Sequence, residues 1–307
     1  MIVMNWLNNI IKYLQSLDYR LSVNSYFKFY DRMDDETYLK FFFRKKMNQE
    51  LDLSDPKTFN EKLQWLKLYD RSPIYTKMVD KYEVKDYVSK IIGNDFVIPT
   101  LGVYDKFDDI DFEKLPNQFV LKCTHDSGGL VICKDKKTLD IKAVRNSINK
   151  SLRRDYYKSG REWPYKNVPK KIIAEEYMKN ADGSNLLDYK FFCFNGNPKM
   201  ILVCLDRFSK NGMRENFYDT DWNLLPLCRP KHPNTDYEVL PPKNLSEMVA
   251  IAHSLSQNTK FSRIDLYEIN GKIYFGEITF FPASGFEMFQ PKEWDYKLGE
   301  WLNLDNK

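Results

Sequence analysis

The chain has 307 residues, a formal net charge of +4, an aromatic share of 15% and five cysteines. This length allows two or three packed subdomains. The small net charge argues against a nucleic-acid partner, which would need a concentrated basic stripe. Five cysteines without CxxC spacing argue against zinc and a disulfide framework, so we expect reduced thiols and a cytoplasmic location. No stretch approaches the roughly 18 apolar residues that a membrane span requires.

Residues 1–50 are predicted to form a helical extension. Near its start, apolar residues recur at helical spacing, namely Trp6, Ile10, Ile11, Leu14 and Leu17. We expect this first helix to pack on the body of the protein. The alternative is a peripheral membrane contact through residues 1–20, for which only Lys12 and Arg20 supply positive charge.

Two further helices are predicted in residues 51–115. The first begins at Ser54-Asp55-Pro56, where a capping residue precedes a proline that needs no N–H partner. The second starts near Ser72-Pro73 and runs to about Ile92, and Gly93 is placed to end it. From residue 96 onward, short extended segments replace the helical pattern.

The rest of the chain alternates between strands and a few helices. Strands are expected at 118–124, 130–133, 171–177, 188–194 and 199–206, helices at 141–154 and 245–257, and a hairpin over 261–280. Residues 155–170 and 209–243 have no regular pattern. Because helices and strands are largely segregated, the sequence predicts an α+β fold rather than a doubly wound parallel sheet. Both common nucleotide fingerprints, G-x-G-x-x-G and G-x-x-x-x-G-K-[ST], are absent.

A lysine on a strand leads directly into a glycine turn. Lys122 is followed by His125 and then by Ser127-Gly128-Gly129. A lysine within an apolar strand needs a partner for its charge, and a glycine turn lets backbone N–H groups approach an anion. The segment therefore favours a polyphosphate site. The alternative is a plain hairpin whose lysine reaches solvent.

Two other strand ends carry charged side chains. Glu175-Glu176-Tyr177 ends an apolar strand, and only one of the two carboxylates can face the core side. That carboxylate could accept hydrogen bonds from a ribose or an adenine amino group, or it could simply be salt-bridged. Lys190 stands near the start of one strand and Arg207 ends the next, so the two could line a phosphate site between facing strands; the alternative is a surface ion-pair network.

The register of the last hairpin decides what its carboxylates can do. A two-residue Asn270-Gly271 turn would pair Asp265 with Gly276 and put Glu277 on the opposite face. A three-residue loop with a bulge would pair Asp265 with Phe275 and bring Glu277 to the same face.

In the second register, oxygen ligands suited to Mg²⁺ would share one face of the hairpin. These are the carboxylates of Asp265 and Glu277 and the hydroxyl of Thr279, with Arg263 beside them. The alternative is a hairpin with a polar, solvent-facing side.

Taken in order, these segments resemble the ATP-grasp superfamily, and specifically its TupA-like branch from bacterial polysaccharide gene clusters, over about residues 50–300. The motifs that carry the resemblance are Ser54-Asp55-Pro56-x-Thr58-Phe59-Asn60-Glu61-Lys62, Lys77-x-x-Asp80-Lys81, Phe119-Val120-Leu121-Lys122-x-x-His125-x-Ser127-Gly128-Gly129, Glu175-Glu176-Tyr177, Asp188-Tyr189-Lys190, Arg263-x-Asp265 and Gly276-Glu277-Ile278-Thr279-Phe280. The resemblance implies two α+β lobes that clasp ATP, a small lobe 116–176 with a glycine-rich flap and a C-terminal lobe 177–307. An N-terminal region 51–115 precedes them.

The resemblance also implies roles for individual residues. Contacts to ATP would come from Lys81, Lys122, the flap Ser127-Gly128-Gly129, and Glu175, Glu176 and Tyr177. The reacting groups would be steadied by Lys190, Arg207 and Arg263, and Mg²⁺ would be held by Asp265, Glu277 and Thr279. Many ATP-grasp enzymes carry Asn where this chain has Thr279.

By the same resemblance, we expect a carboxylate–amine ligase that forms an amide through an acyl phosphate. Its substrates would be small-molecule or glycan carboxylates and amines, such as a uronic acid of a surface polysaccharide and an amino acid. Two alternatives remain at this stage: a glycosyltransferase or sugar kinase of polysaccharide synthesis, and a non-catalytic nucleotide-binding module.

Overall fold

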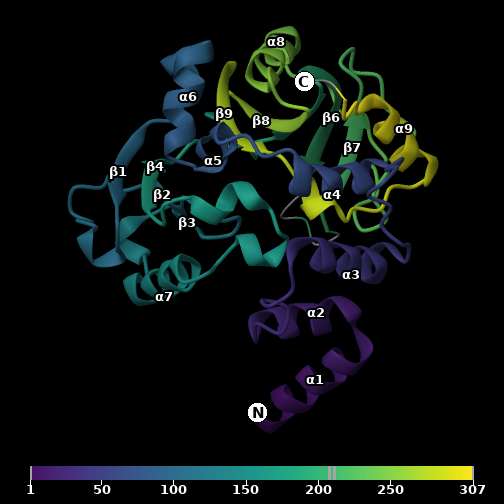
Figure 1. Ribbon diagram of the computed structural model, residues 1–307. Helices are drawn as coiled ribbons and strands as arrows, with labels where there is room; N and C mark the ends of the chain where they lie inside the picture. The colour runs from purple at the N-terminus through teal and green to yellow at the C-terminus, as the bar shows by residue number, and fades with distance from the viewer. Residues whose placement is uncertain (1, 207–208, 210–211, 306–307) are drawn as a thin grey trace.

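The computed structural model describes residues 2–206, 209 and 212–305 (Figure 1). The helices are α1 (Ile2–Gln15), α2 (Leu17–Tyr26), α3 (Asp35–Met47), α4 (Phe59–Tyr69), α5 (Ile74–Val79), α6 (Glu83–Ile92), α7 (Ile141–Leu152), α8 (Leu245–Ser256) and α9 (Glu293–Trp301). The strands are β1 (Thr100–Tyr104), β2 (Phe119–Cys123), β3 (Leu130–Cys133), β4 (Ile172–Glu176), β5 (Asp188–Phe194), β6 (Asn197–Leu205), β7 (Arg214–Tyr218), β8 (Phe261–Ile269) and β9 (Lys272–Thr279). No helix of this described part is both long and apolar enough to cross a membrane.

Two sheets form the body of the molecule, with strand orders β1-β4-β2-β3 and β7-β6-β5-β8-β9. The pairings within both sheets are antiparallel, which confirms the α+β prediction. The smaller sheet includes β1, whose Tyr104 pairs with Ile172 of β4. The expected start of the small lobe at residue 116 is therefore too late.

The larger sheet is covered on both faces, which explains the apolar run of β5. Phe192 and Phe194 pack against Phe59 of α4, with ring centroids 6.4 and 5.7 Å away. Cys193 points to the other side, where its Sγ lies 3.8 Å from the carbonyl oxygen of Ala252 in α8. Because successive side chains of a strand alternate between faces, the second half of β5, residues 191–194, can be continuously apolar only when both faces are buried.

The N-terminal extension is helical, as predicted, and its third helix is part of the body. Tyr38 and Phe42 of α3 are buried, and the guanidinium of Arg161 donates hydrogen bonds to the carbonyls of Tyr30 (2.9 Å) and Met33 (3.0 Å). Helix α1, in contrast, packs against α2 and extends away from the two sheets (Figure 1). The expectation that the first helix lies on the body is therefore wrong.

Helix α4 begins later than the sequence analysis predicted. Thr58 and Glu61 form a reciprocal capping box: the Thr58 hydroxyl accepts a hydrogen bond from the Glu61 N–H (3.2 Å), and the Glu61 carboxylate accepts one from the Thr58 N–H (2.9 Å). The predicted start at Ser54 is wrong because the Ser54 N–H and hydroxyl bond to Asp52 (2.8 and 2.6 Å) in a turn before the helix.

The single helix predicted over residues 72–92 is broken in two. Asp80 is extended (ψ 116°), and its carboxylate accepts hydrogen bonds from the N–H groups of Tyr82 (2.8 Å) and Glu83 (3.3 Å), which starts α6. The Lys81 N–H donates to the carbonyl of Thr124 at the end of β2 (3.2 Å). The break thus places Lys81 beside the glycine turn. Gly93 ends α6 with φ 101°, as predicted.

Strand β7 lies inside the segment 209–243 that the sequence analysis left irregular. It pairs with β6 at the edge of the larger sheet. Its Glu215 is buried and accepts hydrogen bonds from the buried Arg229 at 3.3 Å. A charged residue on the core side breaks the apolar alternation by which a strand is identified, so the pattern concealed this strand.

Candidate active site

Strands β8 and β9 place two carboxylates face to face. Asp265 is paired directly with Glu277, and the register shifts between Asp265 and Leu266, so Gly276 is an extra residue in β9. A Cβ on Gly276 would lie 3.0 Å from the Asp265 carbonyl oxygen, which explains why glycine suits the bulge. The hairpin combines the two-residue Asn270-Gly271 turn with this mid-strand bulge, so neither of the two expected registers is the observed one.

Arg263 holds the two carboxylates together. Its Nε lies 2.6 Å from Asp265 Oδ1, and its Nη2 lies 2.7 Å from Asp265 Oδ2, 2.9 Å from Glu277 Oε1 and 3.1 Å from Thr279 Oγ1. On the neighbouring strand, Lys190 pairs with Asp265 and with Asp188 (2.7 Å). The charges of this buried group therefore compensate one another, as buried charges must.

Glu277 is the carboxylate of this group that remains open to a ligand. The hydrogen bonds from Arg263 and from the Thr279 hydroxyl (3.2 Å) both reach its Oε1, and the side chain is 44% exposed at the wall of a cavity. Burial opposes ionisation, but Arg263, Lys190 and Lys81 outweigh it and lower the pKa of Glu277 to about 2. The group is thus a carboxylate at neutral pH and is suited to a hard cation such as Mg²⁺.

The smaller lobe contributes a second charged group, centred on Glu175. Its Oε1 lies 2.5 Å from Lys85 Nζ and its Oε2 lies 2.5 Å from Lys122 Nζ. Burial opposes ionisation of Glu175, but the two lysines prevail and lower its pKa. Because both oxygens already have cationic partners, Glu175 acts here as the shared counter-ion of two lysines.

Sequence reasoning missed Lys85. It lies on α6 and also donates a hydrogen bond to the carbonyl of Ile98 at 2.7 Å. Nothing in the linear pattern distinguishes it from Lys90 of the same amphipathic helix, which is exposed. Only the approach of α6 to the smaller sheet identifies it.

The turn Ser127-Gly128-Gly129 between β2 and β3 is anchored at its ends. Asp126 accepts hydrogen bonds from the Gly129 N–H (3.3 Å) and from the Ser151 hydroxyl of α7, while Lys81 Nζ donates to the Asp126 carbonyl. Gly128 has φ 137°, and a Cβ there would meet open space. The anchored ends leave the middle of the turn exposed toward a ligand.

These elements surround a cavity of about 360 Å³ between the two lobes. Among the described residues that line it, the charged ones are Lys81, Lys85, Lys122, Lys190, Glu175, Asp188, Asp265 and Glu277. Since four lysines face four carboxylates, the wall has no excess positive charge. A triphosphate would therefore bind more favourably together with a divalent cation. The oxygens of Asp265 are engaged by Arg263 and Lys190, so the open carboxylate of Glu277 is the group best placed for such an ion.

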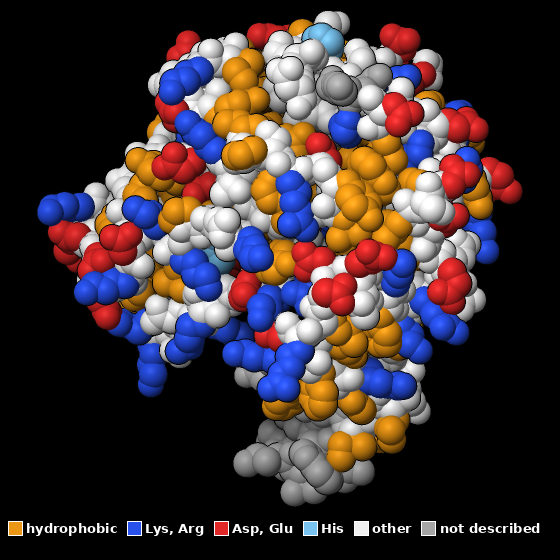
Figure 2. All heavy atoms as spheres, in the orientation of Figure 1, with side chains coloured by type: hydrophobic (Ala, Val, Ile, Leu, Met, Phe, Trp, Pro, Cys, Tyr) orange, Lys and Arg blue, Asp and Glu red, His pale blue; other side chains and the backbone are white. Residues whose placement is uncertain are grey.

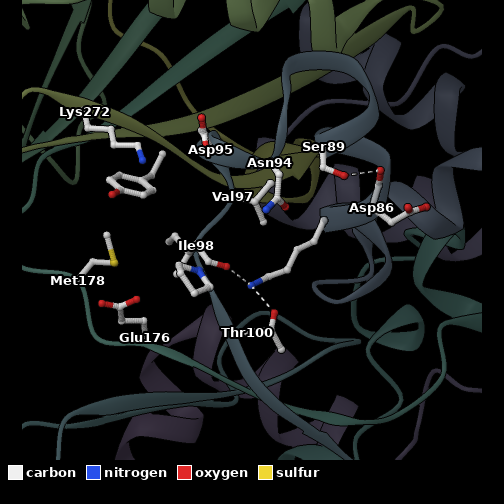
Figure 3. Close-up of a pocket in the computed structure, with 13 residues that line it drawn as sticks. Asp86, Ser89, Asn94, Asp95, Val97, Ile98, Thr100, Glu176, Met178 and Lys272 are labelled. Atoms are coloured by element: carbon white, nitrogen blue, oxygen red, sulfur yellow. Dashed lines mark hydrogen bonds between the residues drawn. The ribbon is translucent and has the colours of Figure 1, made fainter. Parts of the chain in front are cut away.

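A second cavity, of about 480 Å³, adjoins the first, and both are lined by Lys85, Val97 and Ile98. Figure 3 shows Glu176, Met178 and Lys272 on one side of it and Asn94 and Asp86 on the other. Its wall mixes apolar and polar groups, as expected for a site that receives a flat ring and its sugar.

Most of the residues predicted for the site meet at the first cavity: Lys81, Lys122, Ser127, Gly128, Gly129, Glu175, Lys190, Asp265 and Glu277. Glu176 instead lines the second cavity, and Tyr177 is found in the lining of neither. Arg207 lies outside the described residues.

Arg263 and Thr279 are part of the hairpin network rather than of the cavity wall. The hydroxyl of Thr279 is engaged with Arg263 and Glu277, and its role as a metal ligand stays a prediction. Within the described part of the chain, no three His, Cys, Asp or Glu side chains are grouped to hold a metal ion. An ion at Asp265 and Glu277 would therefore share its remaining positions with phosphate and water.

Two α+β lobes that face each other across a cavity lined by lysines, carboxylates and a glycine turn are the architecture of an ATP-grasp protein. The sequence model of the family described as TupA-like ATPgrasp matches residues 61–303, and the chain belongs to this family. No curated protein matches the sequence.

Solved structures show distant similarity. The D-alanine–D-alanine ligase of Helicobacter pylori is 13% identical with a TM-score of 0.43, over 80% of this chain and 69% of that one. The ATP complex of the Bacillus anthracis D-alanine–D-alanine ligase is 16% identical with a TM-score of 0.39, over 66% and 53%. The ATP-grasp ligase PsnB is 12% identical with a TM-score of 0.42, over 78% and 63%. The chain thus spans between about half and two thirds of the length of these ligases.

Proposed function

We propose that this protein is an ATP- and Mg²⁺-dependent ligase that joins a carboxylate to an amine. The observation that carries the proposal is the convergence of lysines from both lobes and carboxylates from one hairpin on a single cavity. No cysteine or histidine is among the described residues of its wall, so covalent catalysis by such a side chain finds no support there. The family described as TupA-like ATPgrasp supports ATP as the substrate.

In the first step, an oxygen of the substrate carboxylate would attack the γ-phosphorus of ATP, and ADP would leave. In the second, the amine nitrogen would attack the carbonyl carbon of the acyl phosphate, and phosphate would leave as the nitrogen loses its proton. Phosphoryl transfer needs mainly positioning and charge neutralisation. Lys81, Lys122 and Lys190 would bind phosphate oxygens, and the N–H groups of the glycine turn would close over them.

Asp265 and Glu277 would hold Mg²⁺, which supplies charge neutralisation at the phosphate oxygens when bound. Arg263 would position these two carboxylates, since its hydrogen bonds go to them and not to the cavity. The base and ribose would occupy the second cavity, between Met178, Tyr274 and Val97. Glu176, on the wall of that cavity, would accept hydrogen bonds from ribose hydroxyls.

For the substrates, we propose a uronic acid of a bacterial surface polysaccharide, such as a capsule, and an amino acid. This choice rests on the resemblance to the TupA-like branch alone, because a fold does not specify a substrate.

The test is to incubate the pure protein with ATP, Mg²⁺, a uronic acid and a set of amines, and to follow ADP and free phosphate. A ligase releases both products only when both acceptors are present. ADP without free phosphate would identify a sugar kinase. Intact ATP under all conditions would contradict the ligase and leave a glycosyltransferase or a binding module.

A further inference from the structure

Helices α1 and α2 carry large apolar side chains on their outer surface. Leu14 is 67% exposed and Phe29, just after α2, is 71% exposed, while Ile10, Ile11 and Leu17 are also exposed. In Figure 2, hydrophobic and basic side chains lie together near the lower end of the molecule, next to the undescribed atoms. Such a cluster at a protruding end is typical of a contact surface. We call residues 9–17 and 27–29 the N-terminal foot.

Hydrogen bonds define which side of the α1–α2 pair faces the body. The Arg20 guanidinium donates to the carbonyls of Tyr13 (3.1 Å) and Leu14 (2.8 Å) and so satisfies the end of α1. The Tyr13 hydroxyl donates to Asn24 (2.9 Å), and the Asn24 amide donates to the Tyr30 hydroxyl (3.1 Å). The ring of Tyr30 packs on α3. The pair is therefore held in one orientation through its Tyr13 side.

The apolar residues of α1 lie on a different side. Ile10, Ile11 and Leu14 are spaced one, three and four residues apart and share one helix face, from which Tyr13 and Lys12 diverge. With Tyr13 turned inward, this apolar face remains on the outer surface, in agreement with its exposure. Helix α1 has 14 residues, so it is too short to span a bilayer and could only lie along one.

The charges around the foot are complementary to an anionic surface. Lys12, Lys28 and Arg32 are exposed. The nearby Asp31 does not offset them, because its carboxylate is engaged by Lys158 of the body at 2.9 Å. Amphipathic helices with basic residues beside apolar ones insert into the headgroup layer of anionic bilayers.

We propose that the N-terminal foot docks the protein on the surface of a bilayer that contains anionic lipids. Leu14, Ile10 and Phe29 would enter the boundary between headgroups and acyl chains, and Lys28, next to Phe29, would contact the anionic headgroups. A convex end that carries basic and apolar side chains is suited to a lipid layer, because lipids can adapt to its shape and no matching groove is required. The cavity between the lobes would remain open, since the foot extends away from both sheets (Figure 1).

The test uses the full chain and sedimentation with two kinds of vesicle, phosphatidylcholine alone and phosphatidylcholine with about 30% phosphatidylglycerol. We expect the protein to pellet with the anionic vesicles and much less with the neutral ones. Leu14→Glu should abolish pelleting, whereas Leu240→Glu, at a matched side chain that is 72% exposed elsewhere on the surface, should not. Lys28→Gln should weaken binding about fivefold, and Lys12→Gln, on the opposite side of α1 from Leu14, should weaken it less.

Circular dichroism tests whether Leu14→Glu is folded. If it is not, Phe29→Glu serves as a second variant. Retention of the unmodified protein in the supernatant with both vesicles would overturn the proposal. The proposal would also be overturned if Leu14→Glu and Leu240→Glu lost pelleting with the anionic vesicles to the same extent. If solution mass shows a dimer that Leu14→Glu converts to a monomer, and vesicles are not bound, the foot is a self-association surface instead.

Discussion

The two sheets around the cavity differ in how firmly they hold their functional groups. In the five-stranded sheet, Asp188 and Asp265 are buried and cross-paired with Lys190 and Arg263, between layers of helices on both faces. In the four-stranded sheet, β3 leaves Leu130 and Ile132 about half exposed, at 49% and 46%. Segments with few buried apolar contacts open most easily. The larger lobe thus provides a fixed charged platform, and under the proposed function the turn of the smaller lobe would close over the nucleotide.

The largest loss of activity should follow a substitution in the fixed charged platform of the larger lobe. We expect Glu277→Gln to lower kcat by on the order of 10²–10³, because an oxygen ligand with full charge is lost at the transferring phosphate. Its fold should persist, since the side chain is partly exposed. The matched control is Glu268→Gln on β8 of the same hairpin, which does not line the cavity. Steady-state kinetics with near-normal turnover of Glu277→Gln would refute the metal assignment.

A substitution in the smaller lobe should have a smaller effect, and this effect should be on the affinity for ATP. Lys122→Met removes a cation that would contact ATP, and we expect the Kd for ATP to rise roughly 10- to 100-fold, in line with the loss of a charged hydrogen bond. Lys171 lies just before β4 of the same sheet, is 40% exposed and is paired with Asp105, so Lys171→Met should leave the Kd unchanged. Isothermal titration calorimetry measures both. Equal affinities for the two variants would mean that the smaller lobe does not hold the nucleotide.

A substitution in the glycine turn should change kcat more than it changes the stability of the fold. Gly128→Ala forces a φ of 137° on an alanine, which costs on the order of 1–3 kcal/mol in the turn as the structure has it. We expect about a tenfold lower kcat with a melting temperature within a few degrees of the unmodified protein. Gly183→Ala is the control, because Gly183 also has positive φ (77°) and open space around it but lies outside both cavities. Identical kinetics for the two variants would contradict a closing turn.

A last effect, on stability rather than on activity, should be seen away from the cavity, in the large lobe. Burial raises the pKa of Asp295 to about 6, although its carboxylate accepts a hydrogen bond from the Asn60 N–H at 3.0 Å. The folded state therefore binds more protons than the unfolded state between about pH 4 and 6, and stability falls as the pH rises through this window. Relative to Asp295→Asn, the unmodified protein should lose up to about 3 kcal/mol of unfolding free energy. Urea denaturation of both proteins at several pH values checks this difference. If their unfolding free energies changed with pH in parallel, the prediction would be contradicted.

Much of the site could be predicted because its residues stand out from apolar surroundings. Lys122 within a buried strand and Asp265 within the apolar β8 are costly unless they are paired, and the structure pairs both. The break at Asp80 could also have been found, since Asp is a good capping residue and Glu83 follows three positions later. The apolar spacing of residues 72–92 masked this signal.

Other features left no trace in the linear pattern. The bulge at Gly276 depends on close contact between two backbones, and a glycine in a strand is compatible with several registers. Lys85 looks like any lysine on an amphipathic helix until α6 is placed against Glu175. The same holds for β7, whose buried Glu215 is acceptable only because Arg229 comes from a distant segment.

By itself, the sequence determined the class of fold, most of the strands and the residue types available for chemistry, because propensity and apolar period act over short distances along the chain. The tertiary structure decided which of those residues meet. The contact of Lys85 and Lys122 with Glu175 joins elements far apart in the chain. The pairing of Asp265 with Glu277 depends on a bulge within one hairpin, and the outward face of α1 depends on how α1 packs on α2. Such contacts follow from packing and charge compensation in three dimensions, which no local pattern specifies.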